Sequence, residues 1–139
     1  MRIVADTNTI VSALLWRGSP HRLIAAVEEY PIDFYTSRAL LSELADVLPR
    51  RKLSKAIRAT GKTPGQLIAE YEGFVQMVTP ASIRRTVPGD VDDDQVLACA
   101  LAARADLIVS GDAHLRNLKR YQGMRIVAAA EALAIIVEA

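Results

Sequence analysis

Short apolar runs alternate along this chain with longer segments in which apolar residues recur at helical spacing. Each short run ends at polar or turn-forming residues, which is typical of a buried β-strand. The first run, for example, starts at Arg2 and ends at the polar residues Asp6, Thr7 and Asn8. This pattern predicts strands over residues 2–5, 32–36, 77–79, 107–109 and 125–127.

The longer segments predict helices. Ser37 is a suitable N-cap for a helix that runs to about Leu48, because serine hydroxyls accept hydrogen bonds from the first turn. Leu40, Leu44 and Val47 then form an apolar stripe on one face of that helix. The same spacing predicts further helices over residues 10–15, 21–30, 54–60, 64–76, 92–104 and from 129 onward, and a loop at 88–90.

Strands that alternate with helices predict an α/β fold, with a parallel sheet covered by helices on both faces. In such sheets, ligands bind just outside the carboxyl ends of the strands. Polar residues that directly follow a predicted strand are therefore the first candidates for a functional site.

Composition narrows the class of protein. A length of 139 residues predicts one domain over residues 1–139, and 51% hydrophobic with 24% charged residues excludes a disordered or fibrous chain. The net charge of +1 excludes a polycation but allows a local basic patch. The single cysteine, Cys99, cannot form an internal disulfide or a thiolate cluster for zinc. Without a visible targeting or membrane-spanning segment, we expect a cytoplasmic protein.

Two aspartates follow predicted strands. Asp6 comes directly after the first strand, and Asp112 follows the strand at 107–109 after a Ser110-Gly111 turn. If these two strands are neighbours, both carboxylates stand at the same edge of the sheet. Either aspartate taken alone is equally well explained as the cap of a turn or helix.

Asp94 and Glu43 are the acids that helices bring to the same edge. Asp94 shares one helix face with Leu97 and Ala98, so we expect its carboxylate on the core side, with Asp93 turned about 100° away. Glu43 lies about 100° from the centre of its apolar stripe, at the boundary of the buried face. Asp46, on the opposite side of that helix, is expected to be solvated.

Four carboxylates in one cleft repel one another, so their convergence calls for a cation. Ligands that are all oxygen suit Mg²⁺ or Mn²⁺ better than zinc. Ions of this kind clamp a phosphodiester and activate water. The candidate metal ligands and catalytic residues are Asp6, Glu43, Asp94 and Asp112.

The chain resembles the PIN-domain ribonucleases, most closely the short VapC-like proteins that act as toxins of toxin–antitoxin pairs. Relatives often carry a second aspartate two residues after the last motif acid, where this chain has His114, which we expect to lie on the surface. The resemblance rests on four blocks in the family's order: residues 4–14 around Asp6, 37–48 around Glu43, 92–100 around Asp94 and 107–112 around Asp112.

This resemblance implies a three-layer α/β/α fold with about five parallel strands. It implies Mg²⁺- or Mn²⁺-dependent endonucleolytic cleavage of RNA by water, which leaves a 5′-phosphate and a 3′-hydroxyl. It assigns supporting roles around the metal to Thr7, Asn8 and Ser110, although local turn hydrogen bonds explain these residues equally well. A cognate antitoxin and a homodimer are the partners that it implies.

Basic residues gather in two places. Residues 47–69 contain six basic and no acidic residues before Glu70, and Arg50, Arg51 and Lys52 are adjacent within this stretch. Such a surface is suited to tracking phosphates, although an ordinary solvated helix face explains it equally well. A second group follows Asp112 closely and is placed to hold an RNA backbone near the cut: Arg116, Lys119 and Arg120.

Two alternatives stay open at this stage. A haloacid-dehalogenase-like phosphatase also begins with an aspartate after its first strand, but it needs a second aspartate where this chain has Asn8. A PIN fold that only binds RNA or protein, without catalysis, is expected to have lost some of the four acids. All four are present.

Overall fold

One six-stranded sheet runs through the centre of the protein, whose computed structural model describes residues 1–84 and 91–139. Its strands are β1 (Arg2–Ala5), β2 (Asp33–Thr36), β3 (Gln76–Met77), β4 (Leu107–Val109), β5 (Arg120–Tyr121) and β6 (Met124–Val127). They lie in the order β3-β2-β1-β4-β6-β5. Neighbouring strands pair in parallel except β5, which is antiparallel to β6.

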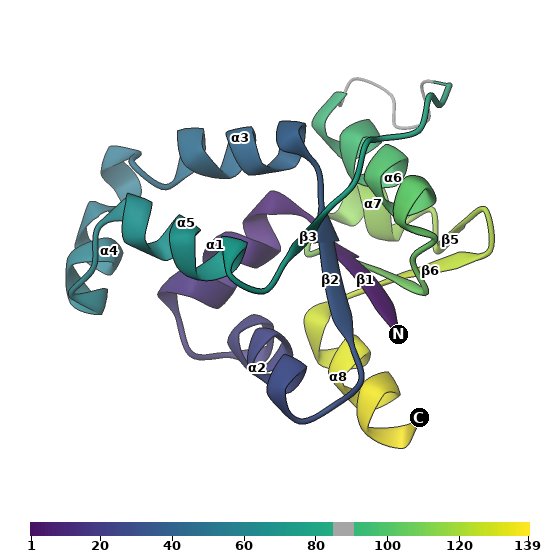
Figure 1. Ribbon diagram of the computed structural model, residues 1–139, viewed down its shortest axis with the longest axis horizontal. Coiled ribbons are helices and arrows are strands. Elements are labelled where there is room, and N and C mark those ends of the chain that lie inside the picture. The colour runs from purple at the N-terminus through teal and green to yellow at the C-terminus, as the bar shows by residue number, and fades with distance from the viewer. Residues whose placement is uncertain (85–90) are drawn as a thin grey trace.

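Helices cover both faces of this sheet. Figure 1 shows α1, α2 and α8 on one side and α6 and α7 on the other, while α3, α4 and α5 extend away from the sheet. The α-helices are α1 (Thr7–Leu15), α2 (Ser19–Ala25), α3 (Arg38–Val47), α4 (Ser54–Thr60), α5 (Pro64–Glu72), α6 (Val91–Ala103), α7 (Ala113–Arg116) and α8 (Ala129–Glu138). Two 3₁₀ turns, η1 (Ala26–Glu28) and η2 (Arg51–Leu53), follow α2 and precede α4.

The core has two parts because strand side chains alternate between the two faces of a sheet. One part packs against α1, α2 and α8 and contains the strand residues Ile3, Ala5, Phe34, Leu107, Val109 and Val127. The other packs against α6 and α7 and contains the strand residues Val4, Tyr35, Ile108 and Ile126. Apolar residues on both faces therefore bury all of β4 and residues 3–5 of β1, as their apolar sequences predict.

The predicted three-layer α/β fold with five parallel strands is confirmed. The sixth strand, β5, and the short helix α7 were not predicted, because segments of two and four residues are too short to show a hydrophobic period. The segment predicted as one helix over 21–30 is α2 followed by a 3₁₀ turn. The loop predicted at 88–90 lies outside the described residues. No helix in the described ranges combines the length and apolar character that crossing a bilayer requires.

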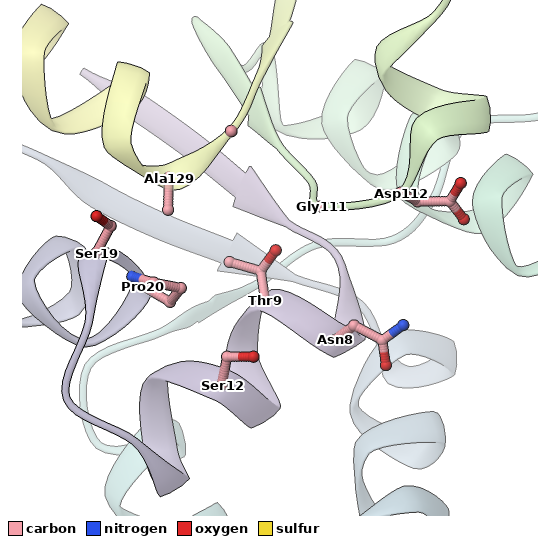
Figure 2. Close-up of a pocket in the computed structure, with 9 residues that line it drawn as sticks. Asn8, Thr9, Ser12, Ser19, Pro20, Gly111, Asp112 and Ala129 are labelled. Carbon is pink, nitrogen blue, oxygen red and sulfur yellow. The ribbon is translucent and has the colours of Figure 1, made fainter.

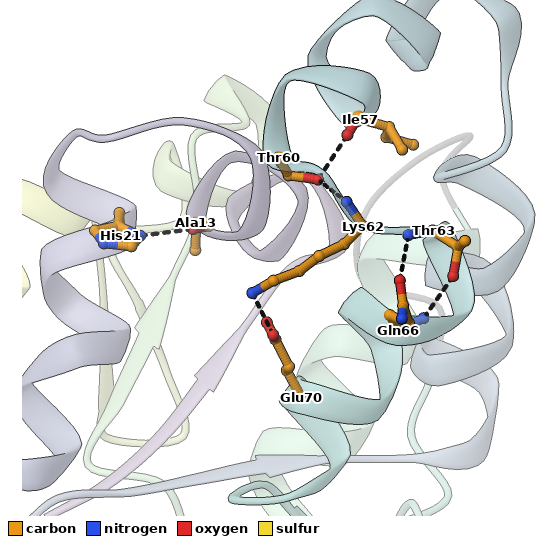
Figure 3. Close-up of polar contacts among 8 residues, drawn as sticks. All are labelled: Ala13, His21, Ile57, Thr60, Lys62, Thr63, Gln66 and Glu70. Carbon is orange, nitrogen blue, oxygen red and sulfur yellow. Dashed lines mark hydrogen bonds and ion pairs between the residues drawn. The ribbon is translucent and has the colours of Figure 1, made fainter.

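Aromatic packing links the end of helix α5 to strand β2, and a capping box fixes the start of the helix. The ring of Tyr71 meets that of Phe74 edge-on at 5.5 Å, and Phe74 in turn meets Phe34 of β2 at 6.2 Å. At the start of the helix, the Thr63 hydroxyl accepts from the Gln66 amide while the Gln66 side chain accepts from the Thr63 amide (Figure 3). This capping box satisfies two backbone donors at once.

We predict that Thr63→Ala lowers the free energy of unfolding by about 1 kcal/mol, because it removes one half of this capping box. The matched control is Glu70→Gln, which removes the exposed ion pair between Glu70 of the same helix and Lys62, just before the helix. An exposed pair of this kind contributes only about 0.2–1 kcal/mol. Urea denaturation of the three proteins measures both effects. A Thr63→Ala variant as stable as the wild type would show that the cap contributes nothing.

Candidate active site

Asp6 stands at the carboxyl end of β1, where its side chain is held from two directions. It is the N-cap of α1, and its Oδ1 accepts from the Thr9 amide at 2.9 Å. Its Oδ2 accepts from the hydroxyl of Ser110, which follows the neighbouring strand β4. Asp6 and Ser110 are both buried. The hydrogen bonds fix the orientation of this carboxylate within the protein.

Asp112 reaches the same edge through the turn that follows β4. Its backbone amide donates to the Ser110 hydroxyl at 2.9 Å, and its carboxylate accepts from the His114 amide at 2.7 Å as the N-cap of α7. The Ser110 hydroxyl therefore links two residues that are distant in the sequence, because it donates to the Asp6 carboxylate and accepts from the Asp112 amide. Register explains their proximity, because Ala5 of β1 lies opposite Val109 of β4 and the Asp6 amide donates to the Val109 carbonyl.

The first turn of α6 and the middle of α3 add further carboxylates. Asp93 and Asp94 are buried, Asp92 is exposed and Glu43 is half-buried. One carboxylate oxygen each from Asp93 and Asp112 and one ring nitrogen of His114 lie within 4.8 Å of one another. Such a spacing allows a single cation to contact all three side chains.

These groups surround one small space, here called the acidic cavity. Its volume of about 30 Å³ is enough for a water molecule or an ion with a water ligand. Within the lining, the Thr7 hydroxyl oxygen is buried and has no hydrogen-bond partner among the residues that the structure describes. The cavity is lined by Asp6, Thr7, Asn8, Glu43, Asp92, Asp93, Val96 and Asp112.

A larger depression, here called the central hollow, adjoins the acidic cavity, because Asn8 and Asp112 line both. Its volume is about 440 Å³. In Figure 2, Asn8 and Asp112 lie toward one side of the hollow, and Ser19 and Pro20 lie toward the other. The full lining is Asn8, Thr9, Ser12, Ser19, Pro20, Gly111, Asp112, Ala128 and Ala129.

The structure brings three of the four predicted acids to the cavity: Asp6, Glu43 and Asp112. The expectation that Asp93 turns away is wrong, because Asp93 lines the cavity. The prediction took α6 to have one buried face, but the helix is buried almost all round, from Val96 through Ala100. Asp94 is also buried but is not among the lining residues, so the cavity favours Asp93 over the predicted Asp94 as the acid that α6 contributes.

His114 is the site candidate that the sequence reasoning missed. It is exposed, as expected, yet its ring lies beside the carboxylates of Asp93 and Asp112. Its position two residues after Asp112 was the available signal, since the short helix α7 returns that side chain toward its own N-cap. Of the predicted supporting residues, Thr7 and Asn8 line the cavity. Ser110 is not among the lining residues, but its hydroxyl donates a hydrogen bond to Asp6.

Cys99 and Tyr71 are buried reactive groups that take no part in this site. Burial raises the pKa of the Cys99 thiol to about 12, and a hydrogen bond with Ser37 opposes the shift. Burial also raises the pKa of Tyr71 above its ordinary value, against a hydrogen bond with Thr36. Both groups are therefore neutral at physiological pH. The prediction that Cys99 is a small core residue is confirmed.

The basic residues singled out in the sequence lie outside the acidic cavity. Arg50, Arg51 and Lys52 are exposed at and before η2, beyond the end of α3. Arg116 and Lys119 are exposed close to α7 and line a separate pocket.

Comparison with known proteins bears on the whole arrangement. No curated protein matches the chain. A family model described as the PIN domain matches residues 2–114, a span that contains every acid of the cavity. This match, together with the parallel sheet and the acids at its carboxyl edge, shows that the chain belongs to the PIN-domain family.

Proposed function

We propose that this protein is a metal-dependent endoribonuclease that hydrolyses RNA phosphodiester bonds at the acidic cavity. The observation that carries the proposal is the convergence of carboxylates from separate elements on one small space at the carboxyl edge of the sheet. PIN domains are typically metal-dependent nucleases that act on RNA, which supports the same conclusion. Family membership also removes the haloacid-dehalogenase-like alternative.

The residues of the cavity fit a hard divalent cation. Carboxylate oxygens from Asp6, Glu43, Asp93 and Asp112 line the cavity and suit Mg²⁺ or Mn²⁺, and the ring of His114 adds a nitrogen beside Asp93 and Asp112. Repulsion among these charges favours a bound cation. The buried Thr7 hydroxyl, which has no partner in the described ranges, calls for a water molecule or a ligand in the same space.

When bound, the metal ion would neutralise charge on the phosphodiester and make a water molecule more acidic. The remaining work falls to the protein. The Thr9 amide and the Ser110 hydroxyl hold the Asp6 carboxylate in one orientation. Glu43, half-buried on α3, would orient the attacking water. The products would be a 5′-phosphate and a 3′-hydroxyl.

We further propose that the nuclease serves as the toxin of a toxin–antitoxin pair and acts as a homodimer. The support is the resemblance of its four acidic blocks to those of the short VapC-like proteins. Expression of the protein in a bacterial host would then arrest growth. Growth unaffected by the active nuclease would contradict the toxin role while leaving the cleavage chemistry in place.

We predict that Asp6→Asn reduces Mn²⁺-dependent RNA cleavage by more than the roughly 10–100-fold loss that follows removal of an outer partner of a metal ligand. Ser110→Ala, which removes such a partner, should fall within that range. Asparagine still caps α1, so the fold is retained. The control is Asp46→Asn on the exposed face of α3, which should cleave like the wild type. Full activity of folded Asp6→Asn would refute the assignment of the site.

We predict that Asp93, and not Asp94, shows the thermal signature of a metal ligand. Asp93→Asn removes one charge from the cluster, so it should raise the melting temperature in chelator and reduce the further rise on adding Mn²⁺. In the wild type, Mn²⁺ at 100 times its dissociation constant should stabilise the fold by about 2.7 kcal/mol. Asp94→Asn should retain that rise. The reverse pattern would restore the ligand assignment made from the sequence.

The adjacent residues Arg50, Arg51 and Lys52 are proposed as part of the RNA-binding surface because they are exposed and unaccompanied by acids in the sequence. Charge reversal of all three should weaken RNA binding and flatten its dependence on salt, because fewer counterions are released. Titration of labelled RNA at several KCl concentrations measures this slope. A slope equal to that of the wild type would mean that this surface is merely solvated.

A further inference from the structure

A pocket lined by basic residues, here called the basic pocket, lies beyond the central hollow. Its volume is about 440 Å³, and it shares Ala128 with that hollow. The hollow in turn shares Asn8 and Asp112 with the acidic cavity. Each space therefore adjoins the next through at least one shared lining residue. The charged residues of the basic pocket are Arg116, Lys119, Arg120, Arg125 and Glu131.

The positive charges in this pocket are only partly neutralised. Arg125 forms an ion pair with Glu131 at 2.7 Å. Arg116, Lys119 and Arg120 have no carboxylate within ion-pair distance in the part of the chain that the structure describes. The pocket therefore keeps an excess of positive charge that an anion would compensate.

The backbone holds these cations together at a cost to stability. Arg120 and Arg125 are direct partners in the antiparallel β5–β6 pairing, and like charges placed opposite one another destabilise a sheet. Lys119 adopts a left-handed backbone conformation, with φ of +61°, that residues other than glycine seldom adopt. Its carbonyl accepts from the Ile126 amide at 2.9 Å, which fixes this turn against β6. Of these two features, the paired arginines are specific to the pocket, because Arg104 and Gln122 also adopt a left-handed backbone.

We propose that the basic pocket is a second phosphate subsite for the RNA strand that is cut at the acidic cavity. It would take an internal backbone phosphate of a neighbouring nucleotide, with the strand crossing the central hollow between the two. The excess of positive charge suits a phosphodiester, and the shared lining residues join the pocket to the acids. This inference rests on the proposed nuclease function and names the path of its substrate.

The chain offers a matched pair of variants to test this subsite. Lys119→Gln removes a cation from the basic pocket, and Arg104→Gln removes one before β4, at the amino end of the sheet. Both positions are exposed and have a left-handed backbone, with φ of +61° at Lys119 and +54° at Arg104. Glutamine must therefore adopt a similarly unfavourable backbone conformation in either variant. Binding of a labelled single-stranded RNA is measured in chelator, where it is not cut, at several KCl concentrations.

We expect the triple variant Arg116→Gln, Lys119→Gln, Arg120→Gln to lower the slope of log affinity against log salt by about 0.7, the contribution of one phosphate contact to a single strand. Lys119→Gln alone should lower the slope in the same direction by part of that amount. Arg104→Gln should leave the slope unchanged. Equal slopes for Lys119→Gln, the triple variant and the wild type would overturn the proposal.

A second measurement identifies which phosphate is bound. Uncharged methylphosphonates replace the backbone phosphates of the RNA one at a time. For the wild type, one internal position away from the cut should weaken binding, and the triple variant should lose its sensitivity at that position alone. Sensitivity only to a terminal phosphate, or a pattern that the triple variant does not change, would contradict an internal subsite.

The outcome separates this proposal from the nuclease function. If the protein cleaves RNA with Mn²⁺ but the triple variant keeps the wild-type salt slope, the subsite is wrong and the nuclease function stands. If the slope falls as expected but no cleavage occurs with Mn²⁺, the subsite stands and the nuclease function is wrong.

Discussion

The parallel pairing of β1 with β4 is the constraint on which the site depends. Ala5 lies opposite Val109, so the residues that follow both strands emerge at one edge of the sheet. Asp6 and Asp112, which are far apart in the sequence, are thereby brought within reach of the same Ser110 hydroxyl. Both strands are buried on both faces, which leaves the pairing little freedom to shift. The position of the acids is thus set by the hydrophobic core.

Helix capping helps the protein to hold several carboxylates close together. Two of these acids also cap helices, Asp6 for α1 and Asp112 for α7, so each accepts a backbone hydrogen bond. Negative charge at a helix N-terminus is favourable, which offsets part of the mutual repulsion. The capping role and the proposed metal-binding role therefore fall on the same two residues.

Much of this arrangement was predictable from the sequence. Apolar runs indicated the five parallel strands, and acids after strands indicated the edge at which Asp6 and Asp112 meet. The choice between Asp93 and Asp94 was not predictable in this way, because α6 is buried nearly all round and has no distinct apolar stripe. The basic pocket also escaped prediction as a unit, since it depends on a two-residue strand and on the left-handed turn at Lys119.

The central claim is that the acidic cavity binds a divalent metal ion. The most direct test is a crystal structure with Mn²⁺, in which anomalous scattering locates the ion independently of any assumed ligand. The account predicts an anomalous peak inside the cavity, within ligand distance of the carboxylates of Asp6 and Asp112. A well-ordered cavity with no peak there, in crystals saturated with Mn²⁺, would contradict it.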